Sequence, residues 1–232
     1  MTLLSIVQDA VDDIGGFDVP ATVVGNTDAR QYLRLLNREG EALSRHPWEI
    51  LIKEDTITLV TADQDYALAT DYRYMIPHTQ YNRDDQRPLI WINSREWQFF
   101  KGWTTVNGLN LRARIRNNEL EFEQTITSGD NGKTIAYEYV SKNWTLTSGA
   151  AAQQKFAADD DTSVLDEELL TLGLIWRFKK AKGLEFQTDL MEYSNQVKLA
   201  LARDGGSRDL ELGRDARQHL GVNTPEGTYP SA

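Results

Sequence analysis

Apolar residues recur at helical spacing near the start of the chain. Between Leu3 and Ile14 they follow the three-to-four-residue repeat of one helix face, and Gly15 and Gly16 then break the pattern. A second periodic stretch begins near Asp28, a suitable N-cap, and stops before Pro47, because the residue before a proline disfavours helical dihedrals. Both stretches predict amphipathic helices.

The C-terminal half carries a stronger helical signal. Ser163 and Asp166 match the S-x-x-D start of a capping box, acidic residues follow in the first turn, basic residues fill the last turn, and Gly183 ends the pattern. Apolar positions cover more than a narrow stripe of this helix, so we expect it to lie centrally. Phe186 to Leu201 predicts a further helix.

The middle of the chain has a different pattern. Short segments rich in β-branched and aromatic residues predict strands: "WEILIKEDTITLV", "DYALA", "YRYMIP" and "PLIWI". Ser94 to Lys101 predicts a short helix with Ser94 as its cap. The later stretch "SKNWTLTSGAAAQQKF" is interpreted as an exposed connector.

A hairpin is predicted in "LRARIRNNELEFE", with a two-residue turn at Asn117 and Asn118. This register places three arginines opposite three glutamates on one face and apolar residues on the other. We expect the charged face to be exposed and its ion pairs to fix the register, because a glutamate neutralises each arginine.

The stretch "SGDNGKT" resembles the end of a phosphate-binding loop. Such a loop needs a first glycine where this chain has Thr127, and it leads into a helix, whereas "TIAYEYV" alternates as a strand. We therefore interpret it as the tip of a second hairpin, in which Ile126 faces Ile135 and Phe122 faces Tyr139.

Together these elements predict an α+β fold. The N- and C-terminal helix pairs are expected to form a four-helix bundle that carries an inserted β-rich domain and an extended C-terminal tail. The expected boundaries are 1–46 and 159–205 for the bundle helices, 47–158 for the β-rich domain and 206–232 for a docking tail.

The amino-acid composition limits the kinds of binding or catalytic site that the chain can hold. The chain has no cysteine, scattered histidines and a net charge of −10, which argue against disulfides, zinc clusters and a nucleic-acid clamp. Asp159 to Asp161 lack the glycine and ligand spacing of a calcium loop, so we interpret them as a solvated turn and helix cap. No apolar run would cross a membrane, and no catalytic motif, cofactor site or metal site is recognised. Synthesis and use in the cytosol are expected.

Two groups of residues are candidates for binding partners. The aromatic cluster at residues 97–103 suits either core packing, which we favour, or an interface, for which the candidates are Trp97, Phe100 and Trp103. In the tail, the amphipathic stretch "SRDLELGRDARQHLG" offers Leu210, Leu212, Arg214, Arg217 and Leu220.

Several stretches carry a family resemblance: "SREWQFFKGW", "ELEFEQTITSGDNGKTIAYEYVSKNW", "DTSVLDEELLTLGLIWRFKKAKGLEF" and "ALARDGG". They resemble the head-to-tail adaptor (connector) proteins of tailed phages, which are similar in plan to the tail tubular proteins of short-tailed phages. The resemblance covers mainly Ser94 to Gly206, and its motifs are structural, so no active-site residue is carried over.

The resemblance implies a structural, non-enzymatic virion protein that is synthesised and assembled in the host cytoplasm. It implies a homo-oligomeric ring, with twelve copies expected, between the portal protein and the tail or nozzle proteins, through which genome DNA passes without specific binding. Two alternatives stay open: a neck protein that hydrolyses peptidoglycan, and a tail module that binds carbohydrate or the host surface.

Overall fold

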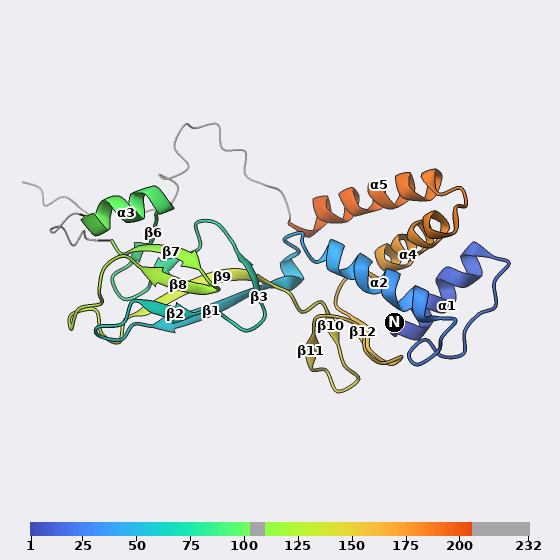
Figure 1. The fold of residues 1–232 in the computed structure, drawn as a ribbon, viewed down its shortest axis with the longest axis horizontal. Helices are drawn as coiled ribbons and strands as arrows, with labels where there is room; N and C mark the ends of the chain where they lie inside the picture. Colours follow the sequence, from blue (N-terminus) through green and yellow to red (C-terminus); the bar gives the residue numbers. More distant parts are fainter. Residues whose placement is uncertain (103–109, 206–232) are drawn as a thin grey trace, which may run out of the picture.

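The computed structural model describes residues 1–102 and 110–205. It confirms a mixed α+β fold, with a β-rich part at one end of the molecule and a helical part at the other (Figure 1). The helical part consists of α1 (Leu3–Ile14), α2 (Arg30–Leu43), α4 (Glu167–Lys182) and α5 (Gln187–Asp204).

Helix α4 is the centre of the helical part, as its wide apolar surface predicted. It packs against α1, α2 and α5. Buried residues of α4, such as Leu170 and Leu174, belong to one apolar cluster together with Leu3 and Ile6 of α1 and Leu36 of α2. The helical part is therefore organised around one helix that contacts the other three.

The strands form two larger sheets and one small sheet. In the first, β1 (Ile52–Thr58), β9 (Thr134–Ser141), β4 (Tyr81–Asn82) and β5 (Arg87–Pro88) follow one another, and β3 (Tyr72–Met75) also pairs with β9. The second has the order β2 (Asp65–Ala67), β8 (Glu119–Phe122), β7 (Arg112–Arg116) and β6 (Ile90–Trp91). The small sheet contains β11 (Ala152–Gln153), β10 (Thr145–Leu146) and β12 (Thr162–Ser163).

The first predicted hairpin is confirmed in register. Strands β7 and β8 pair antiparallel, with Ala113 opposite Phe122 and Arg116 opposite Glu119. The turn residues Asn117 and Asn118 have φ values of 52° and 64°, the left-handed conformation that a two-residue turn requires and that asparagine tolerates.

The charged face of this hairpin is exposed as predicted only at Arg116, because α3 (Ser94–Gly102) covers the rest of it. The guanidinium carbon of Arg114 lies 3.7 Å from the centre of the Trp97 ring, and its Nε donates a 2.6 Å hydrogen bond to Glu121. Arg112 lies 4.1 Å from the centre of the Phe100 ring. Arg112 and Arg114 are thus each held between a carboxylate and an aromatic face.

The second predicted hairpin is wrong. Ile135 pairs with Ile57 of β1, and Tyr139 pairs with Lys53, so β9 lies in a different sheet from β8. Strands that share the same alternation of apolar and polar residues can pair with several different neighbours. Here the chain crosses to the other sheet instead of folding back on β8. A strand still follows "SGDNGKT", which agrees with the rejection of a phosphate loop.

The lysine of that loop is bound to carboxylates of the chain itself. Lys133 Nζ donates to Asp85 at 2.7 Å and to Asp130 at 2.8 Å, and these hydrogen bonds raise the pKa of the lysine. Residues 128–134 therefore form an internally bonded turn.

The connector after β9 is packed at its two ends, whereas residues 148–152 between them are exposed as predicted. Trp144 and Phe156 are buried in the apolar cluster of the helical part, with their rings edge-on at 5.0 Å. The other apolar cluster lies between the two larger sheets and includes Ile57, Leu120 and Ile135. Residues of the segment 47–158 thus contribute to both clusters.

The predicted helix caps are shifted. The capping side chain of α3 is Asn93 rather than Ser94, since its Oδ1 accepts from the amides of Arg95 and Glu96. The second helix starts at Arg30, and its N-cap is Ala29 rather than Asp28, without a side-chain hydrogen bond.

The acidic run before α4 is built into the fold instead of forming a solvated turn. The buried Asp161 carboxylate accepts from the amides of Ala157 and Ala158 at 2.7 and 2.8 Å. Asp159 accepts from the amide of Val24 at 2.8 Å and so holds the α1–α2 loop.

Candidate functional site at the junction of the helices and sheets

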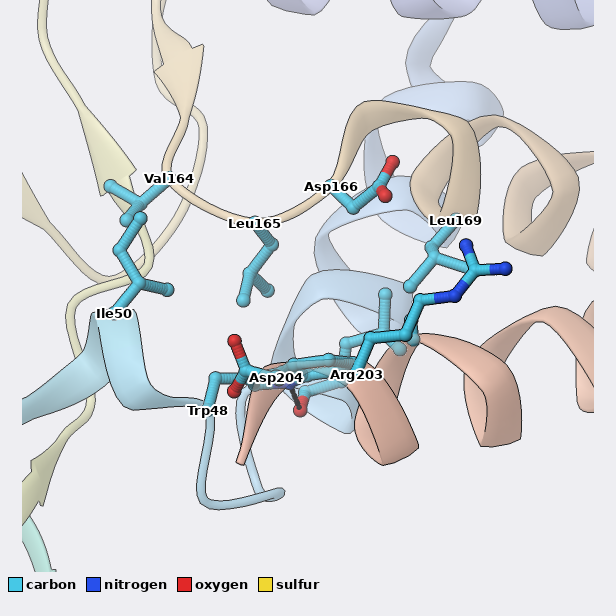
Figure 2. Close-up of a pocket in the computed structure, with 10 residues that line it drawn as sticks. Trp48, Ile50, Val164, Leu165, Asp166, Leu169, Arg203 and Asp204 are labelled. Carbon is cyan, nitrogen blue, oxygen red and sulfur yellow. Dashed lines mark hydrogen bonds between the residues drawn. The ribbon is translucent and has the colours of Figure 1, made fainter. Parts of the chain in front are cut away.

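A pocket of about 380 Å³ lies where the helical part meets the chain that enters β1. Figure 2 shows Ile50 and Val164 on one side of it, Leu169 and Arg203 on the other, and Leu165 between them. The residues that line it come from the end of α2, the start of α4 and the end of α5: Leu43, Trp48, Ile50, Val164, Leu165, Asp166, Leu169, Ala200, Arg203 and Asp204.

One wall is formed where α2 ends. Pro47 prevents the helix from continuing, and the following Trp48 folds back so that its Nε1 donates a 2.8 Å hydrogen bond to the carbonyl of Leu43. A single 3₁₀ turn, η1 (Glu49–Leu51), then presents Ile50 with 60% of its surface exposed.

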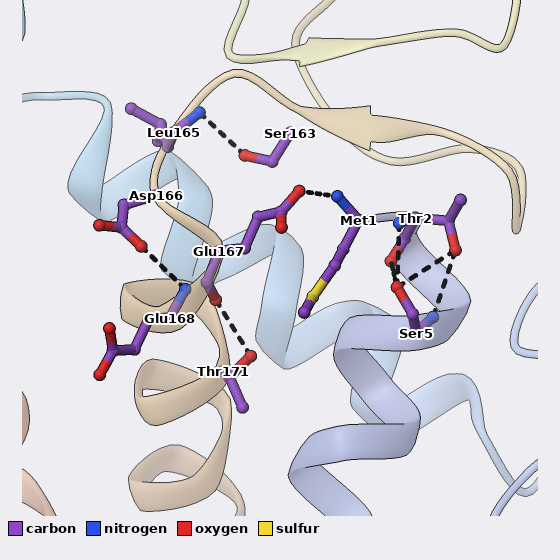
Figure 3. Close-up of polar contacts among 9 residues, drawn as sticks. All are labelled: Met1, Thr2, Ser5, Ser163, Leu165, Asp166, Glu167, Glu168 and Thr171. Carbon is purple, nitrogen blue, oxygen red and sulfur yellow. Dashed lines mark hydrogen bonds and ion pairs between the residues drawn. The ribbon is translucent and has the colours of Figure 1, made fainter.

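The second wall is formed by the start of α4 (Figure 3). Asp166 is the N-cap of this helix and accepts from the amide of Glu168 at 2.9 Å. Ser163, predicted as the cap, belongs to β12, and its hydroxyl accepts from the amide of Leu165 at 3.0 Å. The carboxylate of Glu167 accepts from the N-terminal ammonium group of Met1, which joins the starts of α1 and α4.

The third wall depends on how α5 is held. The buried Glu39 of α2 accepts hydrogen bonds from Arg177 of α4 and Tyr193 of α5, so one carboxylate joins three helices. Burial and then the adjacent Glu39 raise the pKa of the Tyr193 phenol far above its usual range. Lys179 and Asp189 add an ion pair of 2.9 Å. These contacts fix α5, whose last turn carries Arg203 and Asp204.

The chemistry of the pocket suits binding rather than catalysis. Its floor is apolar, and its rim carries the charges of Asp166, Arg203 and Asp204. Asp204 also accepts from the amide of Glu49 at 2.7 Å, which joins α5 to η1. An apolar floor with a polar rim fits an apolar side chain from another segment. No cluster of metal-ligating side chains occurs among residues 1–102 and 110–205.

The predicted partner-binding residues do not lie in this pocket. Trp97 is only 7% exposed and packs within the chain, and Phe100 is half-buried beneath Arg112. Both belong to α3, at the end of the β-rich part that is remote from the helices (Figure 1). The remaining candidates lie outside the described residues: Trp103, Leu210, Leu212, Arg214, Arg217 and Leu220.

Sequence reasoning missed the pocket. A local signal exists in Pro47 followed by Trp48, which marks a large aromatic side chain directly after a helix stop. That signal does not indicate that the start of α4 and the end of α5 line the same pocket as this tryptophan.

No helix of the described part is long and apolar enough to span a membrane. A family model for the SU10 adaptor protein matches residues 1–223, nearly the whole chain. The chain therefore belongs to the SU10 adaptor protein family, as a phage structural adaptor and a virion component. A search of curated proteins finds no match to the chain.

Proposed function

We propose that the protein is a head-to-tail adaptor that forms a ring between the portal and the tail. In this arrangement about twelve copies surround the channel, a number taken from the likeness to other phage connectors, and closed rotational symmetry gives every copy the same neighbours. The helical parts, arranged as a bundle of two helix pairs, face neighbouring copies, and the β-rich parts face the tail or nozzle proteins.

The observation that carries this proposal is the family match over residues 1–223, which includes both ends of the helical part and the entire β-rich part. The two apolar clusters support it, because one chain then offers two separately packed parts for two sets of partners. The C-terminal segment 206–232, with Leu210, Leu212 and Leu220, supplies the attachment to the portal protein and becomes ordered on assembly.

The charge of the chain suits a channel that DNA crosses without being held. At −10 per chain, twelve copies would carry about −120 charges, so a channel wall with this excess repels the phosphate backbone. The chain is expected to be made, and to assemble as a monomer onto the portal, in the host cytoplasm.

Electron microscopy of the purified protein mixed with its portal tests the proposal. We expect a ring of additional density on the tail-facing side of the portal. Absence of binding, or labelled protein located elsewhere than the neck of intact particles, would contradict it.

A deletion variant separates attachment from folding. Removing residues 206–232 should spare the folded monomer, as judged by circular dichroism, and should prevent the ring on the portal. Normal rings with the shortened chain would show that this segment does not attach the protein.

A further inference from the structure

The junction pocket lies at the point where the C-terminal segment begins. Asp204, in the last turn of α5, lines the pocket, and Gly205 ends the described chain beside it. Residues 206–232 therefore start at the rim of an apolar pocket.

The pocket leaves apolar surface uncovered by the described residues. Ile50 is 60% exposed at its edge, next to the half-buried Val164 and the buried Leu165. At roughly 25 cal/mol per Å² of apolar surface removed from water, covering this floor stabilises whatever segment does so. A volume of about 380 Å³ is within the range of pockets that bind ligands and accommodates a leucine side chain.

After Gly206, acidic residues alternate with leucine or arginine at every second position of the sequence. In "RDLELGR", residues 208–214, the positions Arg208, Leu210 and Leu212 share one face of an extended chain, and Asp209 and Glu211 share the other. The first face combines leucines with an arginine, and the pocket combines an apolar floor with a rim of two carboxylates, Asp166 and Asp204, and one guanidinium, Arg203, so that the rim is acidic on balance. The two surfaces are complementary in hydrophobicity and in charge.

We propose that the junction pocket binds residues 207–212 of the same chain, with Leu210 in the pocket and Arg208 at its acidic rim. Leu210 lies six positions after Asp204, a span of up to roughly 20 Å, and the pair Gly205–Gly206 permits the reversal that this path needs. Because the segment is tethered at the rim, its effective concentration is in the millimolar range for a short flexible linker, so a weak contact suffices.

This contact covers Leu210 and Leu212 of the C-terminal segment before assembly. A partner that binds these leucines must first displace them from the pocket, so attachment competes with the intramolecular contact. The contact is a property of the isolated chain and is independent of the proposed ring, whereas its consequence for assembly rests on the proposed function.

A single thiol placed at the pocket edge tests the contact. The chain has no cysteine, so Ile50→Cys in the full-length protein creates a unique site whose rate of modification by a maleimide reports its exposure. We expect Leu210→Asp, added to this variant, to raise the rate by about fivefold or more, because a tethered segment that fills the pocket protects the thiol.

Two controls make the result specific. Leu220→Asp is the same change further along the segment and should leave the rate unaltered, and Ile90→Cys, at an exposed residue of β6, should react equally with and without Leu210→Asp. Equal rates for the Ile50→Cys thiol with and without Leu210→Asp would overturn the proposal. Protection that increases with protein concentration would also overturn it, because the occupant would then be a second copy.

Discussion

Gly40, in α2, leaves room for the Trp144 indole. A Cβ atom at this position would lie 2.0 Å from Cη2 and 2.2 Å from Cζ2 of Trp144, far inside van der Waals contact. Trp144 is fully buried and packs edge-on against Phe156, so its ring has no space into which to move. Gly40 lowers the intrinsic helix propensity of α2, but the packing of Trp144 against this helix requires it.

Gly40→Ala should therefore destabilise the protein. Alanine favours a helix by about 1 kcal/mol over glycine, but overpacking a core costs roughly 1 to 3 kcal/mol and more where the ring cannot shift. We expect a net loss of about 2 kcal/mol in the free energy of unfolding, measured in urea. Gly102→Ala is the matched control, because nothing lies within 4 Å of a Cβ there, and it should be neutral or slightly stabilising. A stable Gly40→Ala variant would contradict the close approach of Trp144.

At the scale of elements, α3 acts as a cover for the charged face of the β7–β8 hairpin. Trp97 and Phe100 lie against Arg114 and Arg112, and both arginines are largely shielded from water. Shielded arginines are stabilised only while they keep their carboxylate and aromatic partners. The packing of α3 thus fixes the ion pairs as well as the sheet.

Trp97→Ala should lower the free energy of unfolding by about 3 kcal/mol, since it removes a buried aromatic ring and uncovers Arg114. Phe99→Ala is the control in the same helix, because Phe99 is 53% exposed, and its effect should stay within about 0.5 kcal/mol. Urea unfolding measures both. An unchanged stability of the Trp97→Ala variant, combined with loss of portal binding, would instead support the predicted partner-binding role of Trp97.

At the scale of the whole molecule, the two apolar clusters are separate but joined by strands of the first sheet. β9 contributes Val140 to the helical cluster and Tyr139 to the cluster between the sheets. Ile52 of β1 likewise packs against the helical cluster, and Ile57 of the same strand belongs to the cluster between the sheets, so β1 and β9 both connect the two cores.

Double-mutant cycles test whether the two apolar clusters are independent, with the same Ile→Val substitution at every position. Ile6→Val and Ile135→Val lie in different clusters, and each should cost roughly 0.5 to 1.5 kcal/mol. Their effects on the free energy of unfolding should add to within about 0.5 kcal/mol. The control pair, Ile57→Val with Ile135→Val, are cross-strand partners and should show a larger coupling. A greater coupling for the distant pair would show that the cores are not independent.

Contacts between sequence neighbours could be predicted from the sequence. The limits of α1 follow from its apolar repeat and the two glycines, and the β7–β8 register follows from the tolerance of Asn117 and Asn118 for positive φ. The α+β class and the central place of α4 follow from period and composition. Each of these depends on dihedral preferences and patterns within a short stretch.

Contacts between distant segments were decided by the tertiary structure. The pairing of β9 with β1, the insertion of Trp144 beside Gly40 and the junction pocket each join residues far apart in the chain. Many alternating strands and apolar residues fit one another locally, so the choice among them depends on the packing of the complete core. The sequence by itself determined the four long helices, the β7–β8 register and the resemblance to a family of adaptor proteins. The partner of each element was determined only in the folded chain, where shape and burial act together.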